Sequence, residues 1–290
     1  MKIIESPREA FQSSDKFIPT EIKIKYINSL LKVGFETVEA GSIVSPKVIP
    51  QLSDTMDVIK KLDLSGTHSK LMVLLVNKKG AQQISVVDEI TCVCYPFPIS
   101  ESFAKRNLNS TIGNCLETID DILNISFTAN KTLIVYISMA FGNTYGDEWN
   151  LDILSKWVEV LQNKGIRIIA LSNVSIEIDA KQITEAFSSL ISQFPEIEFG
   201  LHLHTSEHLW FGKVNAAYKQ GCRRFDGVIN GMGGCPMTGK ELLGNLATEN
   251  LIQFLEREKE IPMGFDHIAF NDASKLGSII FQTHSPSAVT

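Results

Sequence analysis

The stretch Phe199-Gly-Leu-His-Leu-His-Thr205 has the composition of a buried strand that ends in two histidines. Because His202 and His204 are two residues apart, their side chains lie on the same side of an extended chain. Two imidazoles at a strand end are half of a metal site, and two or three further ligands must come from elsewhere. The alternative is a pair of packed or hydrogen-bonded histidines, so the rest of the chain has to be searched for oxygen ligands.

Strand-like and helix-like patterns alternate along the whole chain. A continuous apolar run such as Leu71–Val76 is typical of a strand that is buried on both faces of a parallel sheet. Strands are predicted at residues 2–5, 35–41, 71–76, 89–95, 132–139, 166–171, 199–205 and 223–228. Helices are predicted at residues 20–32, 46–62, 79–84, 111–129, 150–162, 181–193, 207–220 and 241–257. This alternation predicts an α/β fold, a parallel (β/α)8 TIM barrel, with a doubly wound open sheet as the alternative.

The chain shows no internal division. No Pro-, Gly- or Ser-rich linker and no shift in charge marks a domain boundary, so residues 1–283 are expected to form one domain. Thr20 is expected to be the N-cap of the first long helix. A short extra helix is expected around residues 273–281, and residues 284–290 are expected to be a disordered tail.

Composition narrows the class of protein. Hydrophobic residues make up 44% of the 290 and charged residues 21%, and the net charge of −6 argues against a general nucleic-acid binder. The five cysteines are odd in number and lack zinc-type spacing, which favours a reduced, cytoplasmic protein. No signal-peptide pattern and no apolar run of membrane-spanning length is present. A small-molecule partner is therefore expected, without nucleic acid or membrane, and the helix faces could support a homodimer.

In a TIM barrel the carboxyl ends of the strands meet on one face, where function resides. Arg8 lies near the end of the first predicted strand, where it could stabilise an enolate or carboxylate oxygen. A mixed nitrogen and oxygen site for Mg²⁺, Mn²⁺ or Zn²⁺ is predicted from four residues, namely Glu9, His202, His204 and Asn245.

Two further features flank this predicted site. Glu39 lies in the second predicted strand and is interpreted as a buried acid that binds and orients Arg8. Gly231–Gly234 would let a loop fold closely over a ligand, with Cys235 at its tip. A sharp turn and a structural cysteine are the alternative explanations of this loop.

With these residues in order, the sequence resembles the 3-hydroxy-3-methylglutaryl-CoA lyases, which belong to a superfamily of metal-dependent TIM-barrel lyases and synthases. The resemblance runs from Ile3 to about Leu255. Five motifs carry it, at residues 5–12 (ESPREAFQ), 38–51 (VEAGSIVSPK with the following Pro-Gln), 202–204 (HLH), 231–236 (GMGGCP) and 244–249 (GNLATE).

The resemblance implies cleavage of 3-hydroxy-3-methylglutaryl-CoA to acetyl-CoA and acetoacetate, as in leucine degradation. It places a divalent cation, Mg²⁺ or Mn²⁺ rather than Zn²⁺, among Glu9, His202, His204 and Asn245. The catalytic residues that it implies are Arg8, His202 as the base, Cys235 on its loop, and Glu39. The residues that it implies for the acyl-CoA substrate are Gln12, Ser42, Asn173, Lys105, Arg106 and Asn107.

Two motifs depart from the family pattern. Arg8-Glu9-Ala10 stands where the family usually has Arg-Asp-Gly, and Ser172-Asn173-Val174 stands where it usually has Gly-Asp-Thr. If the lost carboxylate matters, Asn173→Asp should raise activity. The alternatives are a metal-dependent acyl-CoA lyase, aldolase or synthase with another substrate, and a catalytically weakened relative that binds metal or acyl-CoA.

Overall fold

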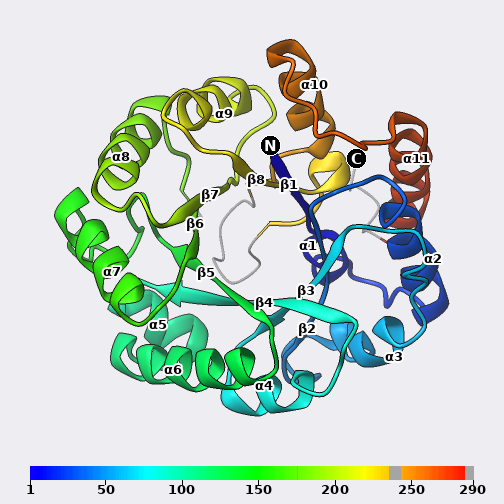
Figure 1. Ribbon diagram of the computed structural model, residues 1–290, viewed down its shortest axis with the longest axis horizontal. Helices are drawn as coiled ribbons and strands as arrows, with labels where there is room; N and C mark the ends of the chain where they lie inside the picture. Colours follow the sequence, from blue (N-terminus) through cyan, green and yellow to red (C-terminus); the bar gives the residue numbers. More distant parts are fainter. Residues whose placement is uncertain (175, 235–242, 285–290) are drawn as a thin grey trace.

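Eight parallel strands close into a barrel in the order of the chain, from β1 beside β2 round to β8 beside β1 (Figure 1). The structure is a computed structural model that describes residues 1–174, 176–234 and 243–284. The strands are β1 Lys2–Glu5, β2 Thr37–Ile43, β3 Lys70–Leu75, β4 Ile90–Pro98, β5 Thr132–Ser138, β6 Ile168–Ser172, β7 Glu198–His202 and β8 Arg224–Gly227. The predicted TIM barrel is confirmed, and all eight strands lie within a few residues of their predicted positions.

Helices surround the barrel (Figure 1). In the described residues they are α1 Pro7–Gln12, α2 Thr20–Leu30, α3 Thr55–Ile59, α4 Lys78–Ile84, α5 Glu101–Leu108, α6 Ile112–Thr128, α7 Leu151–Asn163, α8 Ala180–Gln193, α9 Trp210–Lys219, α10 Thr248–Glu258 and α11 His267–His284. Two 3₁₀ turns, η1 Pro50–Leu52 and η2 Ile229–Gly231, complete the set. Helix α11 packs beside α2 and contains the predicted extra C-terminal helix. Of the predicted tail, His284 ends α11 and the rest lies outside the described residues.

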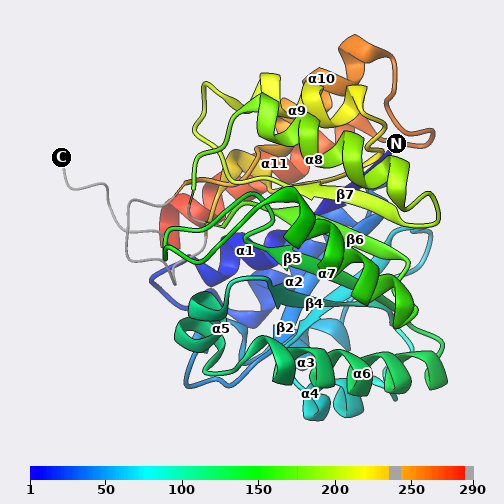
Figure 2. The same cartoon turned by 90° about the vertical axis from the view of Figure 1, so that its left-hand side faces the viewer.

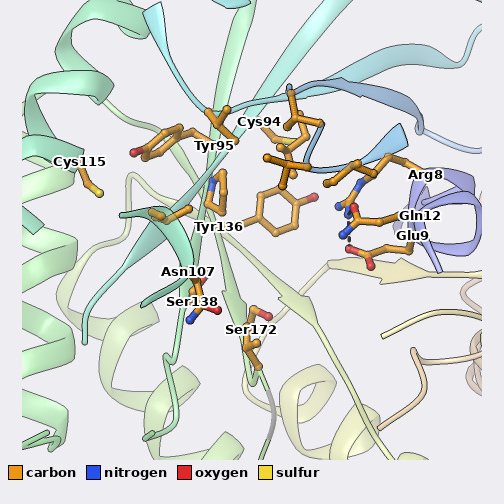
Figure 3. A pocket seen from close by; sticks show the side chains of 18 of the residues that line it. Arg8, Glu9, Gln12, Cys94, Tyr95, Asn107, Cys115, Tyr136, Ser138 and Ser172 are labelled. Atoms are coloured by element: carbon orange, nitrogen blue, oxygen red, sulfur yellow. Dashed lines mark hydrogen bonds and ion pairs between the residues drawn. The ribbon is translucent and has the colours of Figure 1, made fainter. Parts of the chain in front are cut away.

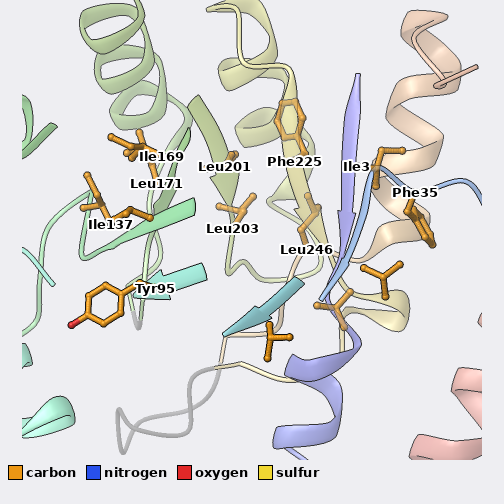
Figure 4. Close-up of a cluster of buried hydrophobic side chains, with 14 of the residues drawn as sticks. Ile3, Phe35, Tyr95, Ile137, Ile169, Leu171, Leu201, Leu203, Phe225 and Leu246 are labelled. Carbon is orange, nitrogen blue, oxygen red and sulfur yellow. The ribbon is translucent and has the colours of Figure 1, made fainter. Parts of the chain in front are cut away.

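Two hydrophobic layers hold the barrel together. Side chains that alternate along each strand point either into the barrel or towards the helices, so Ile4 lies inside while Ile3 packs outside. The interior layer is small and is formed by Ile4, Met72, Cys92, Cys94 and Ile134. The outer layer joins every strand to its covering helices, and Figure 4 shows part of it. Because the interior is filled with side chains, ligands have access to the barrel at its ends and not through its centre.

The end of the barrel that carries the site is built by two short helices that the sequence did not predict. Figure 2 shows α1 and α5 at the end opposite the N-terminus, where the strands finish. Helix α1 begins directly after β1, with Pro7 at its first turn. Helix α5 begins after β4, where the Ser100 side chain accepts a hydrogen bond from the Phe103 amide, and ends at Asn109 in the left-handed conformation.

The predicted helix over residues 46–62 is wrong, because this segment divides into η1 and α3. Gln51 explains the interruption. Its side chain donates hydrogen bonds to the carbonyls of Ser14 and Lys16 and accepts one from the Ile18 amide. These contacts bind the segment to the loop after α1. Tertiary hydrogen bonds therefore outweigh the local helical pattern in determining the conformation of this segment.

Two smaller corrections concern the first residues of helices. Pro19 is the N-cap of α2, and Thr20 is already its first helical residue. The last helix of the barrel begins at Thr248 and not at residue 241, because Asn245 and Ala247 form isolated β-bridges with His204 and Val228. Within the described ranges, no helix combines the length and apolar character needed to cross a membrane.

Candidate active site

A cavity of about 560 Å³ opens at the carboxyl ends of the strands and contains most of the predicted site residues (Figure 3). Its walls come from α1, from the ends of β2 to β7, and from α5 and α6. The predicted residues that line it are Arg8, Glu9, Gln12, Glu39, Asn107, His202 and His204. Residues that are far apart in the chain therefore meet here, as the barrel prediction requires.

Arg8 is held at the wall of this cavity by acids on both sides. Its Nε and Nη2 atoms donate to the two carboxylate oxygens of Glu39, each over 3.1 Å. Its Nη1 atom lies 2.7 Å from Glu9 Oε1 and donates to Gln12 Oε1 over 3.2 Å. Helix α1 makes the arrangement, because residues at positions i and i+4 share a helix face. The result is a guanidinium with a fixed direction, buried but still at the cavity wall.

The two acids around Arg8 have opposite pKa shifts. Burial raises the pKa of Glu39, and Arg8 only partly offsets this rise. Burial also acts on Glu9, but the charges of Arg8 and then His202 outweigh it and lower its pKa. Cys94, on β4, donates its thiol hydrogen to Glu39 Oε1 over 3.4 Å. Glu9 is therefore an ionised carboxylate at neutral pH, as a cation ligand must be.

His202 ends β7 and is oriented by an acid that sequence reasoning missed. Its Nδ1 atom lies 3.0 Å from Asp226 Oδ2 on the neighbouring strand β8. Burial alone would lower the pKa of His202, but the hydrogen bond and charge of Asp226 outweigh it and raise the pKa. The Nε2 atom lies on the side of Glu9, 3.9 Å from its Oε1 atom. A charged residue within a predicted barrel strand is a signal that could have identified Asp226.

His204 lies just beyond β7 and faces the loop that carries Asn245. The two residues form an isolated antiparallel bridge, and the His202 and His204 ring centroids are 5.0 Å apart. Burial, followed by the charge of His202, lowers the pKa of His204 to about 3. His204 is therefore a neutral imidazole with a lone pair available, which is the form that binds metals.

The loop after β8 passes closely between Glu9 and Asn245, and a glycine makes this close approach possible. Gly233 has a φ of +90°, and a Cβ atom there would lie 2.8 Å from the Glu9 carbonyl oxygen and 3.0 Å from Asn245 Nδ2. Only a residue without a side chain lets the loop run between α1 and Asn245. Asn245 Nδ2 donates to the Met232 carbonyl over 2.7 Å, which leaves its Oδ1 atom as the free acceptor.

Orphaned polar atoms test whether the predicted cation fits. Across the described part of the chain, His204 Nδ1 and Asn245 Oδ1 are among the few buried side-chain atoms without a hydrogen-bond partner. Leaving such atoms unpaired costs about 1–3 kcal/mol each, so a missing partner is expected there. Within the same residues, no three His, Cys, Asp or Glu side chains are already spaced as a metal centre, since Glu9 is turned towards Arg8. With the Asn245 amide included, the donor set fits a divalent cation.

The residues predicted to bind the CoA part lie on α5, and the cavity contacts only one of them. Asn107 lines the cavity and donates to the Phe103 carbonyl and to the Tyr145 hydroxyl, over 3.2 and 3.3 Å. The Arg106 guanidinium lies 5.0 Å from the centre of the Tyr145 ring. Lys105 is exposed on the outer face of the helix. All three lie near the cavity mouth, with the two cations outside its wall.

Three other predicted residues of the described ranges do not line the cavity, namely Ser42, Asn173 and Asn245. Ser42 is buried in β2, and its hydroxyl oxygen has no hydrogen-bond partner. Asn173 is also buried, and its amide contacts the backbone of His204 and Ile176. Cys235 lies outside the described residues.

The cavity also has walls that sequence reasoning did not identify. Tyr136 lies in the middle of it, with its ring perpendicular to the His202 ring at a centroid distance of 5.6 Å (Figure 3). Ser138 and Ser172 continue the floor at the ends of β5 and β6. Their positions follow from barrel register, which places Ser138 beside Ser172 and Ser172 beside His202. The strand ends of the sequence contained these residues, but inward and outward directions were needed to choose them.

Comparison with known proteins gives one consistent result. The HMGL-like family model matches residues 2–276. The hydroxymethylglutaryl-CoA lyase of Bacillus subtilis (strain 168) is 29% identical over 87% of this chain and 83% of its own. The mitochondrial hydroxymethylglutaryl-CoA lyase of Bos taurus is 30% identical over 88% of this chain and 78% of its own.

A solved structure agrees with these relatives. The HMG-CoA lyase from Acinetobacter baumannii, in complex with coenzyme A and 3-methylmalate, is 27% identical and superposes with a TM-score of 0.88. The alignment covers 100% of this chain and 93% of that one. The family resemblance carried by the five sequence motifs is confirmed. The chain belongs to the HMGL-like family, together with the hydroxymethylglutaryl-CoA lyases.

Proposed function

We propose that this protein is a carbon–carbon lyase that cleaves 3-hydroxy-3-methylglutaryl-CoA to acetyl-CoA and acetoacetate. One observation carries the proposal. A guanidinium fixed by two acids, a histidine oriented by an acid and a neutral histidine all line one cavity, and Asn245, which has a free amide oxygen, bridges to that neutral histidine. These are the groups that a retro-Claisen reaction needs, because it creates negative charge at one carbon unit while it removes a proton from another.

The cation is the first part of this proposal. Glu9, His202, His204 and Asn245 would hold a divalent ion, with Mg²⁺ or Mn²⁺ favoured by the two oxygen ligands and Zn²⁺ less so. Bound there, the ion supplies positive charge that makes a substrate hydroxyl more acidic and stabilises oxygen atoms that gain negative charge. Its ligands are an ionised carboxylate, two imidazoles and an amide, so the site keeps positive charge when it is filled.

His202 is the proposed base. Asp226 holds the Nδ1 side of the ring, so Nε2 is the free nitrogen. Because one nitrogen cannot bind a cation and accept a proton at the same time, His202 takes the proton of the 3-hydroxyl group in a step in which Glu9, His204 and Asn245 would hold the cation. As the oxygen becomes a ketone, the bond between C2 and C3 breaks and its electron pair stays on C2 of the thioester. Acetoacetate is thereby formed, and the enolate of acetyl-CoA remains. Asp226 stabilises the imidazolium that results.

Arg8 is the proposed partner of the enolate. Its guanidinium is fixed before substrate binds, so no reorganisation is required when negative charge appears on the thioester oxygen. Glu39 provides this rigidity by taking two of its hydrogen bonds. The enolate carbon then needs one proton to become acetyl-CoA. By family resemblance we assign that role to Cys235, which lies outside the described residues.

The acyl-CoA substrate is proposed to enter beside α5. The Acinetobacter baumannii relative was solved with coenzyme A. In this chain the cavity mouth carries Asn107, with Arg106 and Lys105 nearby, and these residues could bind such a group. Gln12, at the cavity wall, is proposed to contact the acyl part. A substrate contact of Ser42, which is buried in β2, stays a prediction.

Three coarser expectations stay predictions. The described cysteines Cys92, Cys94, Cys115 and Cys222 are free and buried, which supports a reducing compartment such as the cytoplasm. A single domain over residues 1–283 is supported by the closed barrel. Homodimer formation can be decided by light scattering of the purified protein.

Product analysis tests the proposal. The purified chain is incubated with 3-hydroxy-3-methylglutaryl-CoA and Mg²⁺ or Mn²⁺, and then with excess chelator. Equal amounts of acetyl-CoA and acetoacetate, lost on chelation, are expected. If this substrate is untouched while a different 3-hydroxyacyl-CoA is cleaved, the substrate assignment is wrong. If the protein binds acyl-CoAs of a panel but cleaves none of them, it is a non-catalytic relative that binds acyl-CoA.

A further inference from the structure

We propose that Asn173 is a positioning residue: its side-chain amide clamps the backbone of His204 and thereby sets the direction of a cation ligand. The inference rests on the proposed function for the role of His204, and it assigns Asn173 a task other than contact with substrate. It also reverses the expectation that an aspartate at this position would restore activity.

The clamp consists of three short hydrogen bonds. Asn173 Nδ2 donates to the His204 carbonyl over 2.7 Å and to the Ile176 carbonyl over 2.8 Å. Asn173 Oδ1 accepts from the His204 amide over 2.8 Å. Both amide hydrogens and the amide oxygen are in use, and the residue is 0% exposed. No part of this side chain is left over for a ligand in the cavity.

The clamp lies where regular pairing ends. The parallel ladder between β6 and β7 finishes with Ser172 opposite His202. His204 is already outside β7 and has only an isolated bridge to Asn245. Asn173, the next residue after β6, offers its side-chain amide to both backbone groups of His204, as a peptide group in a strand would. The Asn173 side chain therefore extends the hydrogen-bonding pattern of the sheet beyond the last strand pair, and it fixes the position of the His204 backbone.

The ring of His204 has little else to fix it. Among the described residues its buried Nδ1 atom has no partner and is left for the proposed cation, and no hydrogen bond to its Nε2 atom orients the ring. Metal-binding histidines are normally oriented by a hydrogen bond from the second ring nitrogen. In this chain the constraint acts on the backbone, on both sides of the same Cα atom, and the ring direction follows from it.

A carboxylate could not replace this amide. An ionised aspartate accepts hydrogen bonds but donates none, so it could keep the bond from the His204 amide and would lose both others. The carbonyl oxygens of His204 and Ile176 would then face a buried negative charge, and each unpaired group costs about 1–3 kcal/mol. Where the family usually has an aspartate, this chain has used the amide to build local structure.

A second set of contacts holds the residues that follow. Glu177 accepts a hydrogen bond from the Ser206 amide over 3.0 Å and pairs with the buried Lys213 of α9. The Lys213 ammonium also donates to Thr205 Oγ1 over 2.7 Å. The loop after β6 thus holds His204 through Asn173 and Ser206 through Glu177, and Lys213 of α9 holds Thr205 between them.

The test compares Asn173→Asp and Asn173→Leu with Asn150→Asp. Asn150 is an exposed N-cap of α7, where an aspartate caps equally well, so the control makes the same chemical change outside the site. The dissociation constant of Mn²⁺ is measured by electron paramagnetic resonance without substrate. We expect Mn²⁺ binding to weaken about 10- to 100-fold in both Asn173 variants, as for loss of other groups that orient metal ligands, and to be unchanged in the control.

Two further readouts separate positioning from general damage. In metal-free protein, hydrogen–deuterium exchange should speed up in the peptide that contains His204 and stay constant in the peptide of α7. At saturating Mn²⁺, the KM for 3-hydroxy-3-methylglutaryl-CoA should stay near the wild-type value, because Asn173 does not touch substrate. Mn²⁺ binding in Asn173→Asp that equals or exceeds wild type would overturn the proposal.

A variant at the surface covers the case in which the Asn173 variants do not fold. Glu177 is exposed, and Glu177→Ala removes the hydrogen bond to the Ser206 amide. Weaker Mn²⁺ binding and faster hydrogen–deuterium exchange around Ser206 are therefore expected. Unchanged values for both would contradict the inference. None of these readouts needs turnover. Failure to cleave 3-hydroxy-3-methylglutaryl-CoA would therefore refute the proposed function alone.

Discussion

At the scale of single residues, the central feature is a guanidinium shared by two buried acids. Removing one partner of a buried ion pair normally costs several kcal/mol, because the other charge stays behind. Burial lowers the pKa of Arg8, but the negative charges of Glu39 and Glu9 outweigh this effect and raise it. Arg8 therefore remains charged at every pH at which the protein is folded, as an enolate partner should.

Arg8→Met should remove turnover and leave the cation site. We expect kcat to fall at least about 100-fold, the usual effect of losing one donor to a developing oxyanion. Mn²⁺ affinity should be kept or rise, because Glu9 loses the cation that competes for its carboxylate. The measurement is kcat together with the Mn²⁺ dissociation constant. Arg257→Met, at an exposed arginine stacked on Phe211, is the matched control and should change neither. Near-normal kcat in Arg8→Met would refute the enolate role.

The sequence was sufficient for some site residues for a physical reason. Arg8 follows directly after β1 and His202 ends β7, and a parallel barrel must bring strand ends together. Asp226 and Tyr136 lie along strands, where their direction depends on register that a sequence does not contain. The clamp by Asn173 depends on where β7 stops, within one residue. Side chains that bind backbone groups across two loops cannot be read from residue types.

At the scale of elements, the long periodic helices were predictable, whereas among the short helices α4 was predicted and α1 and α5 were not. Helices such as α6 and α8 have apolar stripes over several turns and agree with the prediction. Helices α1 and α5 have 6 and 8 residues, too few for a clear period, yet they carry Arg8 and Asn107. The segment that includes η1 and α3 fails for a different reason, since Gln51 binds backbone of another loop.

Packing of α3 on β2 gives a prediction at this scale. A Cβ atom at Gly41 would lie 2.5 Å from Thr55 Cγ2 and 2.7 Å from Thr55 Oγ1, and the β2–β3 register shifts between Glu39 and Gly41. Gly41→Ala should therefore destabilise the fold by about 1–3 kcal/mol, as overpacking does. It should also lower activity, because Glu39 is displaced. Urea unfolding gives the free energy.

Gly113→Ala is the matched control for this change. Gly113 lies in the first turn of α6, and the nearest atom to an added Cβ is 3.7 Å away. Alanine is the better helix former, so this variant should be as stable as wild type or slightly more stable. Equal unfolding free energies for Gly41→Ala and wild type would show that α3 does not restrain β2.

At the scale of the whole molecule, a buried acid at the end of the first strand links the two ends of the barrel. Glu5, at the end of β1, accepts hydrogen bonds from the Ile229 amide over 2.9 Å and from the Thr248 hydroxyl over 2.6 Å. It thereby joins the N-terminal strand to the segments that follow β8. Burial raises its pKa from the ordinary 4.5 to about 8, with hydrogen bonds opposing the rise.

The raised pKa of Glu5 makes a prediction about pH. Because the folded state favours the protonated carboxyl, its contribution to stability is full below pH 4.5 and is lost as the pH rises towards 8. The loss is at most about 1.4 kcal/mol per pH unit within that window. Glu5→Gln, which cannot ionise, should flatten this slope and be more stable than wild type near pH 8. Glu117→Gln, at an exposed position of α6, should keep the wild-type slope.

Unfolding free energies of these three proteins between pH 5 and pH 8.5 provide the measurement. A slope in Glu5→Gln as steep as in wild type would mean that another group controls the pH dependence. Closure of the barrel itself was predictable, because eight strand–helix units of regular length admit few arrangements. The acid that ties the two ends together was not, because its partners lie more than 220 residues away.

The measurement that tests the central claim most directly is a Mn²⁺ titration followed in two ways on the same sample. Bound Mn²⁺ is measured by electron paramagnetic resonance, and acetoacetate release from 3-hydroxy-3-methylglutaryl-CoA is measured in parallel. If Glu9, His202, His204 and Asn245 form the working cation site, release should saturate with the same midpoint as binding. Both curves should shift together in His204→Ala. Saturated Mn²⁺ binding without acetoacetate, or release that is indifferent to the cation, would contradict the account.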